Sequence, residues 1–510
     1  MKVLTAAQMR QVDRRTFESG IPGIVLMENA GHRVVEFLEK RFAPLSAQRI
    51  TVLCGKGNNG GDGMVIARQL WTRLRPAALH VALLADPDEL RGDAAANLRM
   101  LEACGCPVLR EIPAEARSAT LVVDALLGTG VSGPATGRML EGIREINAGF
   151  PLARVVAVDI PSGMPSDSGE PVGEIARADT TVTFTAPKAG QVLPPNCDRV
   201  GELVVCPIGS PPELYEKDDA VFLSLIEPAM FCALLAPRPR SGHKGTFGHV
   251  LVVAGSRGKT GAAAMSGMAS LRAGAGLVTV ASAHSAIPII AGHAAELMTE
   301  PLEENEWGGI SHNVCLERLA EGMTVIAMGP GMGRHPDIEA LVTRAAAALP
   351  QPMVFDADAL TSEIRGGGKL RVMTPHPGEM ARLSGKSTAE VQRDRVGAAR
   401  TFAMEHEVVL VLKGQRTVIA FPDGAVWVNP TGTPALGTGG TGDVLTGLIA
   451  GLLAQFPQDW RRAIAAAVYL GGLAGEIGAR ELGEKSLVAT DLLRYLPRAM
   501  EECAGLPHGV

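Results

Sequence analysis

The sequence predicts an α/β protein of two domains, each a mainly parallel sheet covered by helices. Short apolar runs that end in glycine or aspartate precede helical patterns, as at residues 50–55, 120–124 and 155–159. Near-continuous apolar strands that alternate with helices are typical of parallel sheets buried on both faces. A chain of 510 residues is also too long for one ordinary core, and prolines crowd a segment near its middle.

Polar residues follow three predicted strands in the first half of the chain. Asn58 and Asn59 come after the run at 50–55, Asp124 ends the run at 120–124, and Asp159 ends the run at 155–159. Ligands of open parallel sheets bind beyond the carboxyl ends of the strands. We therefore expect these side chains to lie in one ligand site.

The segment from about 207 to 241 has the composition of a domain boundary. It holds six prolines and the charge cluster at residues 216–219, and proline density with local charge is typical of linkers. We place the first domain at residues 1–215, a linker at 216–236 and the second domain at 237–510. Apolar runs at 249–255, 324–329, 353–356 and 408–413 restart the α/β pattern.

Composition excludes several classes of protein. Hydrophobic residues are 46% of the chain and charged residues 20%, which is normal for a globular protein without extensive disorder. A net charge of −6 argues against nucleic acid as the main partner. The amino terminus lacks the apolar core of a secretory signal, and the longest uncharged stretch, 273–295, is broken by glycine and proline, so we expect no membrane span. Eight scattered cysteines without a zinc pattern suggest reduced thiols and a cytoplasmic protein.

Two glycine-bearing loops in the first half are candidates for binding a dinucleotide phosphate. The loop at 55–63 is not a GxGxxG fingerprint, because it contains two asparagines and an aspartate, and the second loop spans 128–134. Asn59, Asp124 and Ser162 offer hard oxygen donors that suit potassium. The alternative is that such residues only satisfy backbone N–H groups in turns.

Asp159 and Lys188 form a candidate acid/base pair. Asp159 leaves a buried strand, a rigid turn follows it at 160–163, and Lys188 ends the next predicted strand. A carboxylate and a lysine in one cleft suit proton transfer, whereas a structural ion pair at the sheet rim is the alternative. The residues alone do not decide between the two.

A glycine-rich turn at residues 437–443 leads into an apolar helix. Such a turn exposes unpaired N–H groups at a helix amino terminus, where the dipole favours an anion. Phosphate is the expected guest. Asp443, at the start of the helix, is placed to take a proton from a substrate hydroxyl. The alternative is a turn that caps the helix without any ligand.

These residues resemble the bifunctional NAD(P)H-hydrate repair enzymes, from about Leu4 to Leu492. The resemblance rests in the first half on the motifs at 58–63, 124–130 and 159–163. In the second half it rests on 242–245, 261–262, 272–276, 329–333, 356–360, 374–379, 412–417 and 439–443. The family implies a Rossmann-like three-layer αβα epimerase domain followed by a ribokinase-like αβα dehydratase domain.

The resemblance also implies roles for individual residues of the first domain. Potassium is expected at Asn59, Asp124 and Ser162, and the chemistry at Asp159 with Lys188 nearby. The hydrated coenzyme, NADHX or NADPHX, is expected to contact Asn58, Asn59, Gly60, Gly61, Asp62, Gly128, Thr129, Gly130, Val131, Ser132, Gly133, Pro134 and Asp159.

In the second domain the resemblance implies hydrate contacts at Ala262, Gly331, His376 and Asp443. His376 stands between two prolines, so it either contacts substrate or only shapes the pocket. The catalytic residue is Asp443, and magnesium is expected with the nucleotide. The adenine nucleotide is expected at Lys413, Gly414, Gln415, Arg416, Thr417, Gly439, Gly440, Thr441 and Gly442.

The implied function is repair of hydrated NADH and NADPH. The first domain interconverts the R and S hydrates. The second dehydrates the S form with ADP, in preference to ATP, and releases AMP and phosphate. The family also implies a homo-oligomer.

One rival function is a ribokinase-like small-molecule kinase with an accessory nucleotide-binding domain. The presence of the first domain argues against it. A non-catalytic nucleotide-binding protein is the other, and Asp159, Lys188 and Asp443 argue against it.

Overall fold

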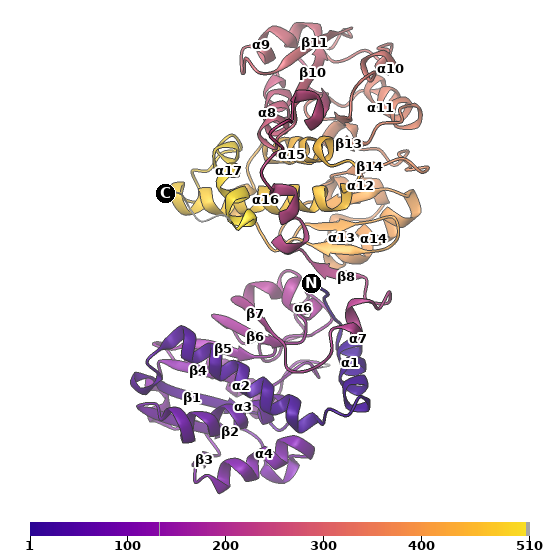
Figure 1. Cartoon of the computed structure of the whole chain (residues 1–510). Helices are drawn as coiled ribbons and strands as arrows, with labels where there is room; N and C mark the ends of the chain where they lie inside the picture. Colours follow the sequence, from indigo (N-terminus) through magenta and orange to yellow (C-terminus); the bar gives the residue numbers. More distant parts are fainter. Residues whose placement is uncertain (132, 506–510) are drawn as a thin grey trace. The chain divides into compact units, whose positions relative to one another are not determined.

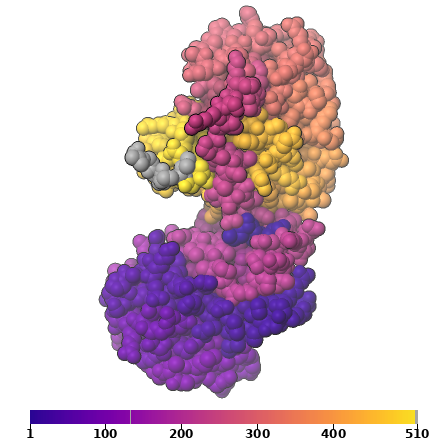
Figure 2. All heavy atoms as spheres, in the orientation of Figure 1, coloured from indigo at the N-terminus to yellow at the C-terminus, as the bar shows by residue number. Residues whose placement is uncertain are grey.

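The computed structural model describes residues 1–131 and 133–505. The chain divides into two compact units, unit 1 from Met1 to Leu223 and unit 2 from Ser224 to Val510. Figure 2 shows the atoms of unit 1 from indigo to magenta and most of unit 2 from magenta to yellow. Each unit is built on its own sheet. The predicted α/β class with two domains is therefore confirmed.

Unit 1 contains a seven-stranded sheet in the order β3-β2-β1-β4-β5-β6-β7, and its strands are parallel. The strand order reverses between β1 and β4, which makes this the point where ligands bind in open α/β sheets. The predicted runs at 50–55, 120–124 and 155–159 correspond to β1, β4 and β5. The strands are β1 (Arg49–Cys54), β2 (Ala78–Leu83), β3 (Val108–Leu109), β4 (Leu121–Ala125), β5 (Arg154–Val158), β6 (Thr180–Phe184) and β7 (Glu202–Cys206).

Helices cover both faces of this sheet (Figure 1). Val52 and Val123 pack with α2, α3 and α4 in one apolar cluster, whereas their neighbours Leu53 and Val122 pack with α5 in another. This alternation explains why the strands are apolar throughout. The helices are α1 (Ala6–Glu18), α2 (Gly23–Phe42), α3 (Asn58–Gln69), α4 (Gly92–Ala103), α5 (Gly137–Ala148), α6 (Ala189–Val192) and α7 (Glu213–Glu216).

Unit 2 contains a ten-stranded sheet in the order β11-β10-β9-β12-β13-β14-β15-β16-β17-β8. The strands from β11 to β15 are parallel, and β16 and β17 extend the sheet by antiparallel pairing. Strand β8 falls within the segment 216–236 that the sequence predicts as a linker. The strands are β8 (Leu223–Leu225), β9 (His249–Val253), β10 (Leu277–Ala283), β11 (Met298–Leu302), β12 (Val325–Met328), β13 (Met353–Phe355), β14 (Arg371–Met373), β15 (Val409–Leu412), β16 (Val418–Ala420) and β17 (Val426–Val428).

The largest apolar cluster of unit 2 joins one face of its sheet to α8, α15, α16 and α17.

The described residues include no helix long and apolar enough to cross a membrane. The helices are α8 (Thr260–Arg272), α9 (Ile287–Ala291), α10 (Leu316–Leu319), α11 (Pro336–Ala348), α12 (Pro377–Ser384), α13 (Thr388–Arg393), α14 (Arg395–His406), α15 (Thr441–Gln455), α16 (Trp460–Leu482) and α17 (Asp491–Ala504).

Helices α8 and α15 pack at very close range because small residues line their contact. A Cβ on Gly447 would lie 2.2 Å from the carbonyl oxygen of Ser266, and one on Gly451 would lie 2.5 Å from that of Ser270. The Ser266 hydroxyl donates to the carbonyl of Asp443 at 3.0 Å, and the Ser270 hydroxyl donates to that of Gly447 at 3.0 Å. Helix α8 therefore fixes the first turn of α15.

We expect Gly447→Ala to lower the free energy of unfolding of unit 2 by about 1–3 kcal/mol, because its new methyl group meets backbone that cannot rotate away. Denaturant unfolding monitored by hydrogen exchange in α8 and α15 measures this. The control is Gly471→Ala in α16, where a Cβ meets only the Leu448 Cδ1 atom at 3.3 Å. Equal stability of the two variants would contradict the proposed close contact.

Candidate active sites

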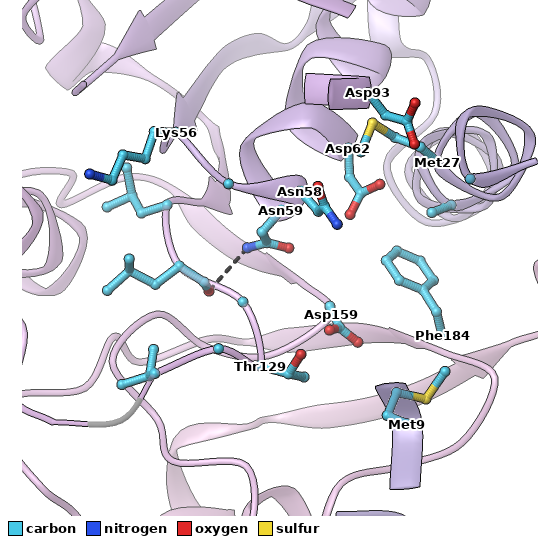
Figure 3. Close-up of a pocket in the computed structure, with 18 of the residues that line it drawn as sticks. Met9, Met27, Lys56, Asn58, Asn59, Asp62, Asp93, Thr129, Asp159 and Phe184 are labelled. Carbon is cyan, nitrogen blue, oxygen red and sulfur yellow. Dashed lines mark hydrogen bonds between the residues drawn. The ribbon is translucent and has the colours of Figure 1, made fainter. Parts of the chain in front are cut away.

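A cavity of about 880 Å³ lies in unit 1 at the carboxyl ends of its strands. In Figure 3 the side chains of Asn58, Asp62 and Asp159 point into one space beside Met9 and Phe184. The predicted site residues that line the cavity are Asn58, Asn59, Asp62, Gly128, Thr129, Gly130, Val131, Asp159 and Lys188. The strand ends therefore bring most of the predicted residues together.

Four residues predicted to contact the hydrate do not line this cavity, Gly60, Gly61, Gly133 and Pro134, and neither do the predicted potassium ligands Asp124 and Ser162. Two of them permit close packing instead. A Cβ on Gly60 would lie 1.9 Å from the Gly55 carbonyl oxygen, and one on Gly61 would lie 2.6 Å from the sulfur of Met27. Ser132, also predicted, lies outside the described residues.

An oxygen cluster lies beneath the two loops of unit 1. The Ser162 hydroxyl donates to Asp124 Oδ1 at 2.5 Å, and the Ser162 amide donates to Oδ2 at 2.9 Å. Asn59 Nδ2 donates to the Leu127 carbonyl at 3.1 Å and so links the two loops. Among the described atoms, the buried Asn59 Oδ1 has no hydrogen-bond partner.

This cluster has the chemistry of an alkali-cation site. Burial raises the pKa of Asp124, although hydrogen bonds from Ser162 and Leu126 oppose that rise. A bound monovalent cation would relieve the same burial cost, and the orphaned Asn59 oxygen would gain a partner. Carboxylate, hydroxyl and amide oxygens are the ligands that hard cations prefer. The residues present therefore fit potassium.

Asp159 and Lys188 form a buried ion pair beside the cavity. The Lys188 ammonium lies 2.5 Å from Asp159 Oδ1, 2.8 Å from the Thr183 hydroxyl and 3.1 Å from the Phe184 carbonyl. The side chain of Lys188 is only 1% exposed. Asp159 itself has a φ of +62°, in the left-handed region. Strained backbone of this kind is concentrated at functional sites, where the surrounding structure holds it.

Two further carboxyl groups face this pair. Burial raises the pKa of Asp13 on α1 to about 6, with Lys188 lowering it and Asp159 raising it. Asp62 is buried, which raises its pKa well above the ordinary value; Asp159 and Asp13 add to the rise and Lys188 opposes it. The sequence analysis did not identify Asp13. The sequence feature that could have pointed to Asp13 is a charged residue on the same helix as Met9, Val12 and Thr16, which are buried.

Unit 2 has a comparable cluster around Lys413, at the ends of β13, β14 and β15. The Lys413 ammonium lies 2.6 Å from Asp356 Oδ1 and 3.9 Å from Glu379 Oε2. The Thr374 hydroxyl donates to Asp356 Oδ1 at 2.7 Å. Asp356 and Glu379 stand in sequence motifs noted above, but sequence reasoning assigned no role to either.

Asp443 approaches this cluster from the amino terminus of α15. Gly440, the residue before the helix, has a φ of +94°, which favours glycine. Burial raises the pKa of Asp443 to about 6; Asp356 and Asp358 add to the rise and Lys413 opposes it. A Cβ on Gly442 would lie 3.3 Å from the Lys413 ammonium, so the turn and the lysine are neighbours.

The other residues of unit 2 that were predicted to contact the hydrate occupy two further positions. Gly331 and Ala262 are adjacent, since a Cβ on Gly331 would lie 3.1 Å from that of Ala262. His376 caps α12: its Nδ1 accepts from the amides of Gly378 at 3.0 Å and Glu379 at 3.2 Å. Its side chain is half exposed. The structure thus gives His376 a capping role.

The predicted nucleotide loop, residues 413–417, is held by a buried arginine that sequence reasoning missed. Arg395 donates to the carbonyls of Leu412 at 3.2 Å and Lys413 at 3.3 Å. Gly414 and Arg416 both have positive φ, at 133° and 54°. Because the C=O and N–H of one trans peptide unit point in opposite directions, the Gly414 N–H faces away from Arg395.

Comparisons with known proteins give matches for both units. Residues 23–190 match the family model of the YjeF-related protein N-terminus, and residues 250–498 match that of NAD(P)H-hydrate dehydratase. A bifunctional NAD(P)H-hydrate repair enzyme of Moorella thermoacetica is 44% identical over 98% of both chains. Another from Thermofilum pendens is 38% identical over 98% of this chain and 96% of its own.

Several solved structures are similar to part of this chain. One of them is the ADP/ATP-dependent NAD(P)H-hydrate dehydratase of Bacillus subtilis, co-crystallised with ATP and Mg²⁺. It is 35% identical, has a TM-score of 0.51, and the match covers 55% of this chain and 98% of that one.

We expect Lys188→Met to lower the free energy of unfolding of unit 1 by about 3–5 kcal/mol, because it leaves the Asp159 carboxylate without its cation. Hydrogen exchange of peptides from unit 1 under increasing denaturant measures the change. The matched control is Lys56→Met, because the pair of Lys56 with Glu89 is exposed and is worth less than about 1 kcal/mol. If both variants lose the same stability, the Lys188 pair is not buried as described.

Proposed function

The chain belongs to the family of bifunctional NAD(P)H-hydrate repair enzymes, and we propose that it returns the hydrates of NADH and NADPH to the reduced coenzymes. This proposal rests on the similarity to the Moorella thermoacetica enzyme, which is 44% identical over 98% of both chains. We assign epimerisation to residues 1–215 and dehydration to residues 237–510, with a linker at 216–236. The two family matches, 23–190 and 250–498, fall within these ranges.

In unit 1, Asp159 exchanges a proton with the C6 hydroxyl of the hydrate while that hydroxyl leaves and returns. Lys188 holds the carboxylate in place through the ion pair at 2.5 Å. The loops at 58–62 and 128–134, Ser132 included, bind the hydrate. The cavity's position at the strand ends supports this assignment.

Potassium is the proposed cation of unit 1, with Asn59, Asp124 and Ser162 as its ligands. When bound, it supplies positive charge next to the buried Asp124 carboxylate and so stabilises the two loops that form the site. The unpartnered Asn59 oxygen supports this proposal.

In unit 2, Asp443 takes the proton of the C6 hydroxyl, whose oxygen then attacks the terminal phosphorus of the nucleotide. The bond from that phosphorus to the nucleotide's bridging oxygen breaks, and AMP leaves when the donor is ADP. Phosphate then departs from C6 with the C–O electron pair as a proton leaves C5, which restores the double bond. Amides of Gly439, Gly440, Thr441 and Gly442 stabilise the moving phosphoryl group.

The residues at 413–417 hold the adenine nucleotide, while Ala262, Gly331, His376 and Asp443 contact the hydrate. Magnesium, when bound, neutralises charge on the phosphates. The ATP and Mg²⁺ of the Bacillus subtilis enzyme support a nucleotide with magnesium here. We propose ADP as the preferred donor over ATP. From the family resemblance we also propose a homo-oligomer that works in the cytoplasm.

The deciding experiment mixes the purified protein with R and S hydrates of NADH, magnesium, potassium and either ADP or ATP. Recovery of reduced-nicotinamide absorbance is followed with time. Complete recovery is expected, and the nucleotide that supports it identifies the donor. Recovery of only the S fraction would leave unit 1 without its proposed activity, and no recovery with either nucleotide would favour a kinase.

Asp443→Asn is expected to slow dehydration roughly 10²–10⁴-fold, because the amide cannot accept the hydroxyl proton. Nucleotide binding, measured by calorimetry, should persist. Asp459→Asn at the start of α16 is the control, since Asp459 lies on the surface and forms an exposed pair with Arg462. An Asp443→Asn variant with normal turnover would remove Asp443 from the mechanism.

Dehydration is expected to fall as the pH drops below about 6. Asp443 has a pKa raised to about 6, so below that pH its carboxyl holds the proton that it must accept from substrate. The rate should drop about tenfold per pH unit on that side. A pH profile of dehydration with the pure S hydrate tests this, and a profile flat down to pH 5 would contradict it.

A further inference from the structure

We propose that Asp13 is a second catalytic carboxyl group of unit 1, which works with Asp159 in the inversion at C6. The proposal rests on the epimerase activity proposed above and names a further residue for it. Asp13 lies outside residues 23–190, where the family model matches. The sequence motifs that carry the resemblance begin at residue 58, and they gave Asp13 no role.

Helix α1 forms one wall of the cavity, and Asp13 lies on that wall. Met9, Asp13 and Phe17 all line the cavity, and their spacing of four residues puts them on one face of the helix. Asp13 thus stands between two apolar side chains that face the same space as Asp159.

The start of α1 is fixed to the segment that carries Lys188. Leu4 forms a parallel bridge with Lys188: the Leu4 amide donates to Pro187 at 2.9 Å, and the Ala189 amide donates to Leu4 at 3.3 Å. The Thr5 hydroxyl then caps α1 by accepting from the Gln8 amide at 3.2 Å. Asp13 is therefore held at a set position relative to the catalytic pair.

Lys188 cannot serve Asp13 as an ion-pair partner. Its ammonium has three N–H groups, and these already face Asp159, Thr183 and the Phe184 carbonyl. In the described part of the chain Asp13 has no hydrogen bond or ion pair, whereas its helix neighbours Arg14 and Arg15 both have acidic partners. An unpaired, half-buried carboxyl costs stability, so a purely structural role does not explain it.

The environments of Asp13 and Asp159 differ in the way that acid/base pairs require. Asp159 has the Lys188 cation at 2.5 Å. Asp13 lacks such a partner, and burial raises its pKa to about 6. Two carboxyl groups in surroundings this different can divide into an acid and a base. The cavity around Asp13 is also lined by other charged groups, which are Arg10 on the same helix and Lys56, Asp62, Asp86, Glu89, Asp93 and Arg138.

Inversion at C6 needs proton carriers on both faces of the ring. Asp13 gives its proton to the leaving hydroxyl; the C6–O electron pair goes with that oxygen, and water departs. The lone pair of the ring nitrogen forms a double bond to C6. Water then adds to C6 from the other face as that double bond returns its electrons to nitrogen, and Asp159 takes the added water's proton. The reverse epimerisation exchanges the two roles.

The test uses the full-length protein with R and S hydrates, ADP or ATP, magnesium and potassium. The S hydrate disappears first through unit 2, and a slower phase reports epimerisation of the R hydrate. Asp13→Asn should leave the fast phase unchanged and slow the second phase roughly 10²–10⁴-fold. The control Glu18→Gln also replaces a carboxyl group by an amide, at an exposed position of α1, and should alter neither phase. A second phase of normal rate in Asp13→Asn would overturn the proposal.

A pH profile separates proton transfer from positioning. For the R to S direction, the second phase of the unaltered protein should fall above about pH 6, where Asp13 loses its proton, and Asp13→Asn should lack that fall. Asp13→Glu, which keeps the carboxyl, should restore part of the rate and the fall with pH. A slow variant that keeps the original pH profile would also overturn the proposal. Absence of the second phase in the unaltered protein would instead contradict the epimerase function itself.

Discussion

In each unit a mostly buried lysine forms a close ion pair with one carboxyl group, and further carboxyl groups lie near that pair. In unit 1, Lys188 pairs with Asp159 while Asp62 and Asp13 remain nearby. In unit 2, Lys413 pairs with Asp356 while Asp443 remains close. Carboxyls taken out of water without a cation hold their protons more tightly. Burial accordingly raises the pKa values of Asp13 and Asp443 to about 6, as acid/base groups require.

The fold creates this crowding in the same way in both units. Parallel strands bring the paired residues to one sheet edge: Asp159 and Lys188 follow β5 and β6, and Asp356 and Lys413 follow β13 and β15. The surplus carboxyl then comes from a helix held by its own contacts. The bridge at Leu4 sets the start of α1, and the Ser266 hydroxyl sets the first turn of α15. Contacts elsewhere on each helix therefore keep the carboxyl groups close together although their negative charges repel one another.

Residues at strand ends were predictable from the sequence, whereas residues brought from elsewhere were not. The runs before Asp124 and Asp159 mark strand ends by their apolar pattern alone. The sequence suggested that Lys188 approaches Asp159, either as an acid/base pair or as a structural ion pair, and the distance of 2.5 Å came from the structure. Asp13 depends on where α1 packs, because Asp159 and Lys188 lie 146 and 175 residues further along the sequence, and no local pattern encodes that contact. Arg395 was missed for the same reason, because its partners are backbone carbonyls of a distant loop.

The two lysines differ in a way that matches the chemistry proposed for each unit. Lys188 is 1% exposed and its three N–H groups all face acceptors, so it offers nothing to a substrate and only holds Asp159 in place. Lys413 is 18% exposed, stands beside Gly442 of the glycine turn, and has its second carboxylate at the longer distance of 3.9 Å. A partly exposed ammonium beside the turn that we propose binds phosphate is suited to interact with a transferred phosphoryl group. Proton exchange in unit 1 needs no such contact, because its substrate reacts at an uncharged hydroxyl.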